Sequence, residues 1–149
     1  MLTETLKRLF NRDLKRLKSE IEAYRNEANL WRVDQAITNS AGNLCLHLIG
    51  NLNTYIGAIL GGTNYIRNRE LEFSLKDIPK KQLIEMIEEI TKVVDETLDL
   101  ITNEQLESEY PLLVFEEKTT AGFLLVHLTT HLTYHLGQIN YHRRLLDRE

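Results

Sequence analysis

Residues 127–142 read HLTTHLTYHLGQINYH, and this stretch predicts a long helix with histidines along one side. At 100° per residue, His127, His131 and His135 are displaced by only 40° each around the helix axis. His142 falls between the last two in angle. The histidines border an apolar face whose members recur at helical spacing: Leu124, Leu128, Leu132 and Ile139. The histidines are therefore expected at the edge of a helical core.

The rest of the chain predicts three more long helices and no sheet. The expected helices cover about 3–29, 39 or 40 to 61–62, 79–101, and 119 or 120 to 146. A long connection at 63–78 is expected to contain a further turn, Thr102 opens a capping box, and 107–118 should cross in extended form. The sequence thus predicts an all-α fold, a four-helix bundle formed by a single domain of residues 1–149.

Composition restricts the class of protein. The 149 residues include 2 Pro and 7 Gly, fewer turn residues than a strand-rich fold needs. The single cysteine, Cys45, excludes an internal disulfide framework and an all-thiolate zinc site, which fits a reducing cytoplasm. No export signal is expected at the N-terminus, MLTETLKRLFNRDLKRLK. The net charge of −4 and the acidic residues mixed into the basic N-terminal helix favour a solvated face over a nucleic-acid surface.

One uncharged stretch needs comparison with a membrane span. Residues 35–66 contain no Asp, Glu, Lys or Arg, and 41–62 is long enough to cross a bilayer. The stretch also contains Asn43, His47, Asn51 and Asn53, each of which would need a polar partner in lipid. A helix buried within its own domain is the preferred interpretation, with no membrane partner.

The histidine spacing is compatible with a metal site. Two imidazoles at i, i+4 lie about 6 Å apart along the axis and can share one cation, whereas an i, i+8 pair is too far apart. Spacing leaves both His127/His131 and His131/His135 open, with His142 outside the ligand set. The only histidine elsewhere is His47, so it is the candidate third ligand. Three neutral imidazoles with a free fourth position are typical of catalytic metal sites.

Two segments resemble a known family. Residues 131–139, HLTYHLGQI, look like the HxxxHxGQI signature of the DinB-like superfamily, and 40–52, SAGNLCLHLIGNL, resemble the second helix of a DinB-related branch of uncharacterised proteins. The resemblance implies a four-helix bundle, commonly a homodimer, with nickel or zinc on His47, His131 and His135. Relatives with known activity are S-transferases and isomerases that use bacillithiol, mycothiol or glutathione.

Neighbouring polar residues are candidates for supporting roles. Gln138 and Asn51 lie about one turn from proposed ligands, where an amide can orient a ligand or water; the alternative is an ordinary buried amide. His127 is a candidate hydrogen-bonding neighbour of the ligands. Gly137 suggests close helix approach, and Cys45, about 200° from His47 around its helix, is expected in the core.

The functional prediction is a metal-dependent transfer of a low-molecular-weight thiol to an electrophile. A dication held by neutral ligands favours an anionic fourth ligand such as thiolate, and the chain shows no Ser-His-Asp arrangement or phosphate-binding glycine loop. Two alternatives stay open. One is a hydrolase that uses bound hydroxide. The other is a non-enzymatic dimeric bundle, packed through the helix 2 glycines Gly42, Gly50, Gly57 and Gly61.

Overall fold

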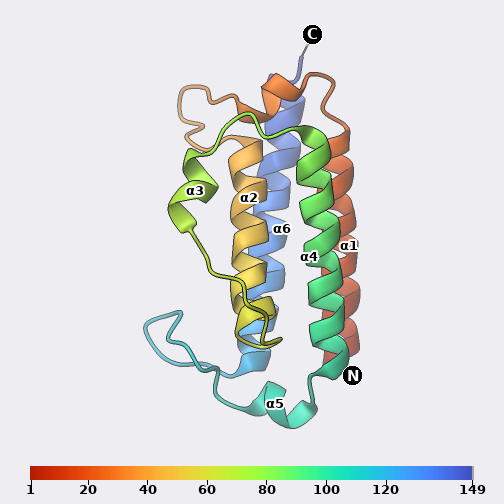
Figure 1. The fold of residues 1–149 in the computed structure, drawn as a ribbon, viewed down its shortest axis with the longest axis vertical. Coiled ribbons are helices and arrows are strands. Elements are labelled where there is room, and N and C mark those ends of the chain that lie inside the picture. Colours follow the sequence, from red (N-terminus) through yellow and green to blue (C-terminus); the bar gives the residue numbers. More distant parts are fainter. Residues whose placement is uncertain (149) are drawn as a thin grey trace.

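The computed structural model describes residues 1–148 and is all-helical over that range, with six α-helices and no strand. Four longer helices lie side by side (Figure 1). The α-helices are α1 (Leu2–Glu22), α2 (Ala41–Leu52), α3 (Arg69–Ser74), α4 (Lys80–Leu100), α5 (Asn103–Glu107) and α6 (Ala121–Leu146). A 3₁₀ helix, η1 (Glu27–Trp31), precedes α2, and a π-helix, η2 (Asn53–Ala58), continues it. The expected all-α fold is confirmed.

The predicted starts of α2, α5 and α6 are confirmed, and each is explained by a side chain that caps the helix. The Ser40 and Thr120 hydroxyls accept hydrogen bonds from the backbone N–H groups of Asn43 and Phe123, which starts α2 and α6. Thr102 and Gln105 form the predicted capping box of α5. Pro79 is the N-cap residue of α4 rather than its first helical residue. The segment before α6 is irregular, with a single bridge between Glu109 and Thr120.

The first helix is shorter than its apolar spacing predicts. It ends at Glu22 instead of near Asn29. The backbone N–H groups of Arg25 and Asn26 donate to the Asp147 carboxylate instead of to helical carbonyls. The Asn26 side chain then caps η1. Tyr24, which follows the end of α1, is nevertheless buried in the core.

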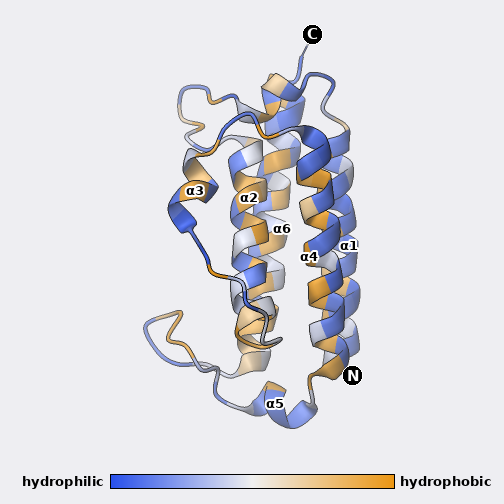
Figure 2. Ribbon diagram, viewed as in Figure 1, coloured by the Kyte–Doolittle hydropathy of each residue, from blue (hydrophilic) through white to orange (hydrophobic). Residues whose placement is uncertain are grey.

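The core lies between the long helices, and the surfaces of α1 and α4 alternate between hydrophilic and hydrophobic residues (Figure 2). The apolar residues that recur at three- and four-residue spacing along α4 are buried: Leu83, Ile87, Ile90, Val94 and Leu98. Ile101, which follows the helix end, is half-buried. Cys45 is fully buried, as expected. No helix within residues 1–148 is long and apolar enough to span a membrane.

The glycines of the second helical segment serve packing inside the chain. A Cβ at Gly42 would press on the Trp31 ring, and one at Gly50 would overlap the Glu72 carboxylate. Gly57 and Gly61 likewise approach side chains of α4. The expectation that these glycines pack against another subunit is therefore wrong, because the space above them is already filled. A Cβ at Gly137 would meet no atom within 4 Å, so this glycine does not mark a close helix approach within the chain.

Candidate metal centre

Three histidines from two helices meet in one cluster. His47 comes from α2, and His131 and His135 come from successive turns of α6. Each has a ring nitrogen within 4.8 Å of one from each of the others. The Nε2 atoms of His47 and His131 are 3.2 Å apart. Of the two pairs that spacing left open, the structure therefore places His131/His135, not His127/His131, with His47.

His47 is held in place by a carboxylate that sequence reasoning missed. Its Nδ1 lies 3.1 Å from Oε1 of Glu72, a residue of α3 that is 5% exposed. Because an ionised carboxylate only accepts hydrogen bonds, Nδ1 carries the imidazole proton and Nε2 presents its lone pair to the cluster. This carboxylate–histidine arrangement is the one that orients metal-binding imidazoles.

Glu72 is itself fixed from two sides. Both of its carboxylate oxygens accept hydrogen bonds from the Arg67 guanidinium, each at 2.9 Å. Its backbone carbonyl accepts a hydrogen bond from the Asn43 side chain at 2.9 Å. The missing side chain of Gly50 leaves the space that the carboxylate occupies. The buried charge of Glu72 is thus paired and its position is determined by α2.

His135 has a corresponding partner on its own helix. Its Nδ1 is 2.7 Å from Oε1 of Gln138, three residues further along α6. An amide oxygen accepts, so His135 donates through Nδ1 and its Nε2 lone pair is free. Gln138 therefore contacts a proposed ligand, as expected for an orienting residue.

His131 lacks this support. Its Nδ1 is buried and has no hydrogen-bond partner within residues 1–148. If Nε2 donates to His47, Nδ1 is a bare buried acceptor; if Nδ1 holds the proton, two lone pairs face each other across 3.2 Å. Burial, with added repulsion from the neighbouring imidazoles, lowers the pKa of His131 to about 4. The ring is therefore neutral at physiological pH, the form in which imidazole binds metals.

The cluster fits a divalent transition-metal ion. Two nitrogens bound at about 2.0–2.1 Å to a tetrahedral ion lie about 3.3–3.4 Å apart, close to the observed separation of 3.2 Å. An ion between the rings would remove the conflict between the facing nitrogens. Burial, the largest influence on His47, also lowers its pKa and keeps that ring neutral. Imidazole donors suit zinc, nickel, copper or iron rather than magnesium or calcium.

The remaining two histidines lie outside the cluster. The His127 ring is stacked beside His131, with centroids 6.4 Å apart, and Phe115 contacts its other side. His127 is therefore a packing neighbour in this structure rather than a ligand. The His142 ring lies between the Tyr24 hydroxyl, 2.6 Å from Nδ1, and the Arg32 carbonyl, 2.8 Å from Nε2. Its role is to join α6 to the N-terminal part of the chain.

Asn51 is buried one turn after His47, and its Oδ1 has no hydrogen-bond partner within residues 1–148. Such an orphaned acceptor in the interior is normally satisfied by water or a ligand. The orienting role and the water-positioning role of this amide stay predictions.

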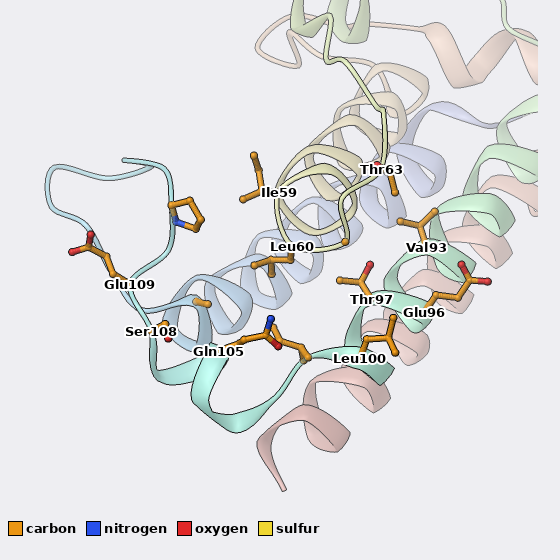
Figure 3. Close-up of a pocket in the computed structure, with 14 residues that line it drawn as sticks. Ile59, Leu60, Thr63, Val93, Glu96, Thr97, Leu100, Gln105, Ser108 and Glu109 are labelled. Atoms are coloured by element: carbon orange, nitrogen blue, oxygen red, sulfur yellow. The ribbon is translucent and has the colours of Figure 1, made fainter.

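A separate pocket lies near α5, away from the histidines (Figure 3). It has a volume of about 430 Å³ and lies among the segment that follows η2, the end of α4 and α5, with Leu60, Thr97 and Gln105 in its lining. None of the five histidines lines it. It contributes nothing to the candidate metal centre.

Comparison with known proteins identifies the family. The sequence matches, over residues 2–149, the family described as "Protein of unknown function (DUF1572)". The chain belongs to this family. A solved structure, described as the conserved protein of a locus from Enterococcus faecalis, is 18% identical and covers 97% of this chain and 96% of its own, with a TM-score of 0.77. At that identity the similarity shows the fold alone. No curated protein matches the sequence.

Proposed function

We propose that this chain is a DinB-like four-helix bundle that binds one divalent metal ion, nickel or zinc, through His47, His131 and His135. The observation that carries the proposal is the convergence of three neutral imidazoles in which His131 has no partner for its buried Nδ1. Glu72 and Gln138 engage the Nδ1 atoms of His47 and His135, which leaves the Nε2 atoms of both rings available to an ion.

The reaction that fits this site best is transfer of a low-molecular-weight thiol to an electrophile. When bound, a dication with three neutral ligands lowers the pKa of a coordinated thiol, so that thiolate forms near neutral pH. The S–H proton leaves to solvent, a new S–C bond forms, and the leaving group departs with its electron pair. Glu72 and Gln138 orient the rings of His47 and His135 through hydrogen bonds to Nδ1. The side chains packed around the rings exclude water from their buried sides.

The nucleophile is proposed to come from outside the chain. Cys45 is fully buried, and burial raises its pKa to about 12, so its thiol is not available as an attacking group. The ligand cluster itself contains only histidines. An external thiol is therefore the simplest source of sulfur for this site.

A thiol-transfer assay tests this function. Chelator-treated protein is reloaded with zinc or nickel and mixed with a thiol and 1-chloro-2,4-dinitrobenzene, and conjugate formation is followed by absorbance. We expect acceleration that requires metal and is lost in His131→Ala but kept in the matched helix variant Thr130→Ala. Equal rates with and without metal would contradict the proposal. Turnover of an ester substrate without thiol would instead support the hydrolase alternative.

We also propose that the chain forms a homodimer through the N-terminal half of α6. The exposed apolar side chains Phe123 and Val126 lie there, and they line one surface hollow together with the exposed Met1 and Leu2. Light scattering on the purified protein should give twice the chain mass. Phe123→Glu should give the monomer mass, whereas Leu100→Glu, an exposed change on α4, should leave the dimer intact.

A further inference from the structure

A second cavity opens beside the histidine cluster. It has a volume of about 450 Å³ and lies between the 36–39 loop, α2 and the C-terminal half of α6. His135 and Gln138 form part of its wall, so a molecule inside it would lie next to a proposed metal ligand. The volume is within the range of small-molecule sites, about 300–1,000 Å³.

The lining of this cavity is uncharged and largely apolar. Ile37, Leu44 and Leu145 provide aliphatic surface, and Tyr134 and Tyr141 provide aromatic surface. The Tyr134 ring centroid is 5.3 Å from that of His135, which continues the aromatic wall up to the cluster. All lining residues belong to the described range 1–148, and none of them is Asp, Glu, Lys or Arg.

The part of the cluster around His47 has a different character. There His47 meets the ion pair of Glu72 and Arg67, in which the guanidinium binds both carboxylate oxygens. Arg67 is thus already engaged and does not offer a free positive charge toward the cavity. The lining of the cavity carries no charge that could recognise an anion. Burial of a carboxylate in it is therefore unfavourable.

We infer that this cavity binds the electrophile, and that the electrophile is a neutral molecule with an aromatic or similarly flat apolar body. The role of this ligand as the electrophile rests on the proposed thiol-transfer function. The apolar walls bury the body of the ligand, and the Gln138 side of the cavity brings its reactive carbon beside the cluster. Anionic molecules of the same size are excluded by their cost of desolvation.

Binding of a matched pair of probes tests the inference without any measurement of activity. The probes are 4-nitrobenzamide, which is neutral, and 4-nitrobenzoate, which has nearly the same shape and carries a negative charge. Affinities are measured by ligand-observed NMR on chelator-treated full-length protein, where the carboxylate gains nothing from a metal ion. We expect the amide to bind at least 10-fold more tightly than the carboxylate.

Two tryptophan variants locate the binding site. Ala36→Trp places a large ring at the exposed edge of the cavity and should weaken binding of 4-nitrobenzamide at least 10-fold. Val33→Trp, an exposed change nearby but outside the cavity, should leave binding unchanged. Leu145→Trp obstructs the cavity from α6 and should weaken binding in the same way. It serves as an independent test if Ala36→Trp changes the conformation of the loop.

The outcomes separate this inference from the proposed function. Equal binding of the two probes, or binding that neither obstructing variant weakens, would overturn the inference even if thiol transfer is observed. Selective binding of the amide that both obstructing variants abolish would support the neutral cavity even if the thiol assay fails.

Discussion

His131 and His142 are both largely enclosed on the same helix, yet their ring nitrogens have opposite surroundings. Both nitrogens of His142 have protein partners, the Tyr24 hydroxyl and the Arg32 carbonyl. One nitrogen of His131 has no partner within residues 1–148, and the other faces a second imidazole. Burial alone therefore does not distinguish a structural histidine from a candidate metal ligand. The distinguishing feature is whether the fold completes the hydrogen bonding of the ring.

The largest expected effect is on the stability of the metal-free protein. His142→Leu leaves the buried Tyr24 hydroxyl and the Arg32 carbonyl without their partner, so we expect a loss of about 2–4 kcal/mol in unfolding free energy. His131→Leu removes a nitrogen that had no partner, so the change should stay within about 1 kcal/mol. Urea denaturation with chelator present measures both values. Equal destabilisation by the two variants would remove the distinction.

The next effect concerns the support of His47. Glu72→Gln keeps the size of the side chain but weakens its hold on the His47 Nδ1 proton, so we expect divalent-metal affinity to fall by about 10–100-fold. Glu70→Gln, an exposed change on the same short helix, is the matched control and should keep wild-type affinity. Competition with a chromophoric chelator gives the dissociation constants. Unchanged affinity in Glu72→Gln would show that the carboxylate only stabilises the fold.

A smaller effect is expected in the pH dependence of stability. Burial lowers the pKa of His131 to about 4 and also lowers that of His142, both from an ordinary value of 6.5. As pH falls below 6.5, the unfolded chain therefore binds protons that the folded chain does not, and stability of the metal-free protein decreases. The slope per histidine is at most about 1.4 kcal/mol per pH unit.

His131→Leu should reduce that slope between pH 6.5 and 4.5, because one of the contributing groups is gone. The carboxylates with lowered pKa, Asp13 and Asp147, lose their stabilising contribution as pH falls below about 5, and they do so in the wild type and the variant alike, so they cancel in the comparison. Unfolding free energies at four pH values, with chelator present, provide the test. Identical slopes in the variant and the wild type would contradict the assignment of a strongly lowered pKa to His131.

Much of this arrangement could be predicted from sequence, and the exceptions have a common cause. Helical spacing predicted α6 and the stripe of histidines, because periodicity within one helix determines which residues share a face. It could not choose between His127 and His135, since that depends on where α2 crosses α6. The resemblance to a family pointed to His135, and the structure brings His135 together with His47 and His131 in one cluster.

Glu72 and Arg67 could not be found in the same way. They belong to the connection between α2 and α4, which has no regular apolar period and whose path depends on tertiary packing. The local signal was Gly50, about one turn after His47 on the same helix, because a glycine there admits a neighbouring side chain. Sequence could not identify that neighbour as a carboxylate from a segment more than 20 residues away.

Whether the three histidines form a metal centre is decided by the metal content of untagged protein purified without chelator. Elemental analysis compares the wild type with His47→Ala, His131→Ala, His135→Ala, His142→Ala and His127→Ala. The three-histidine centre predicts close to one divalent ion per wild-type chain, lost in the first three variants and kept in folded His142→Ala. Retention of the ion in His135→Ala together with its loss in His127→Ala would assign the site to the other histidine pair. Wild-type protein that stays metal-free after incubation with nickel and zinc would contradict the metal centre itself.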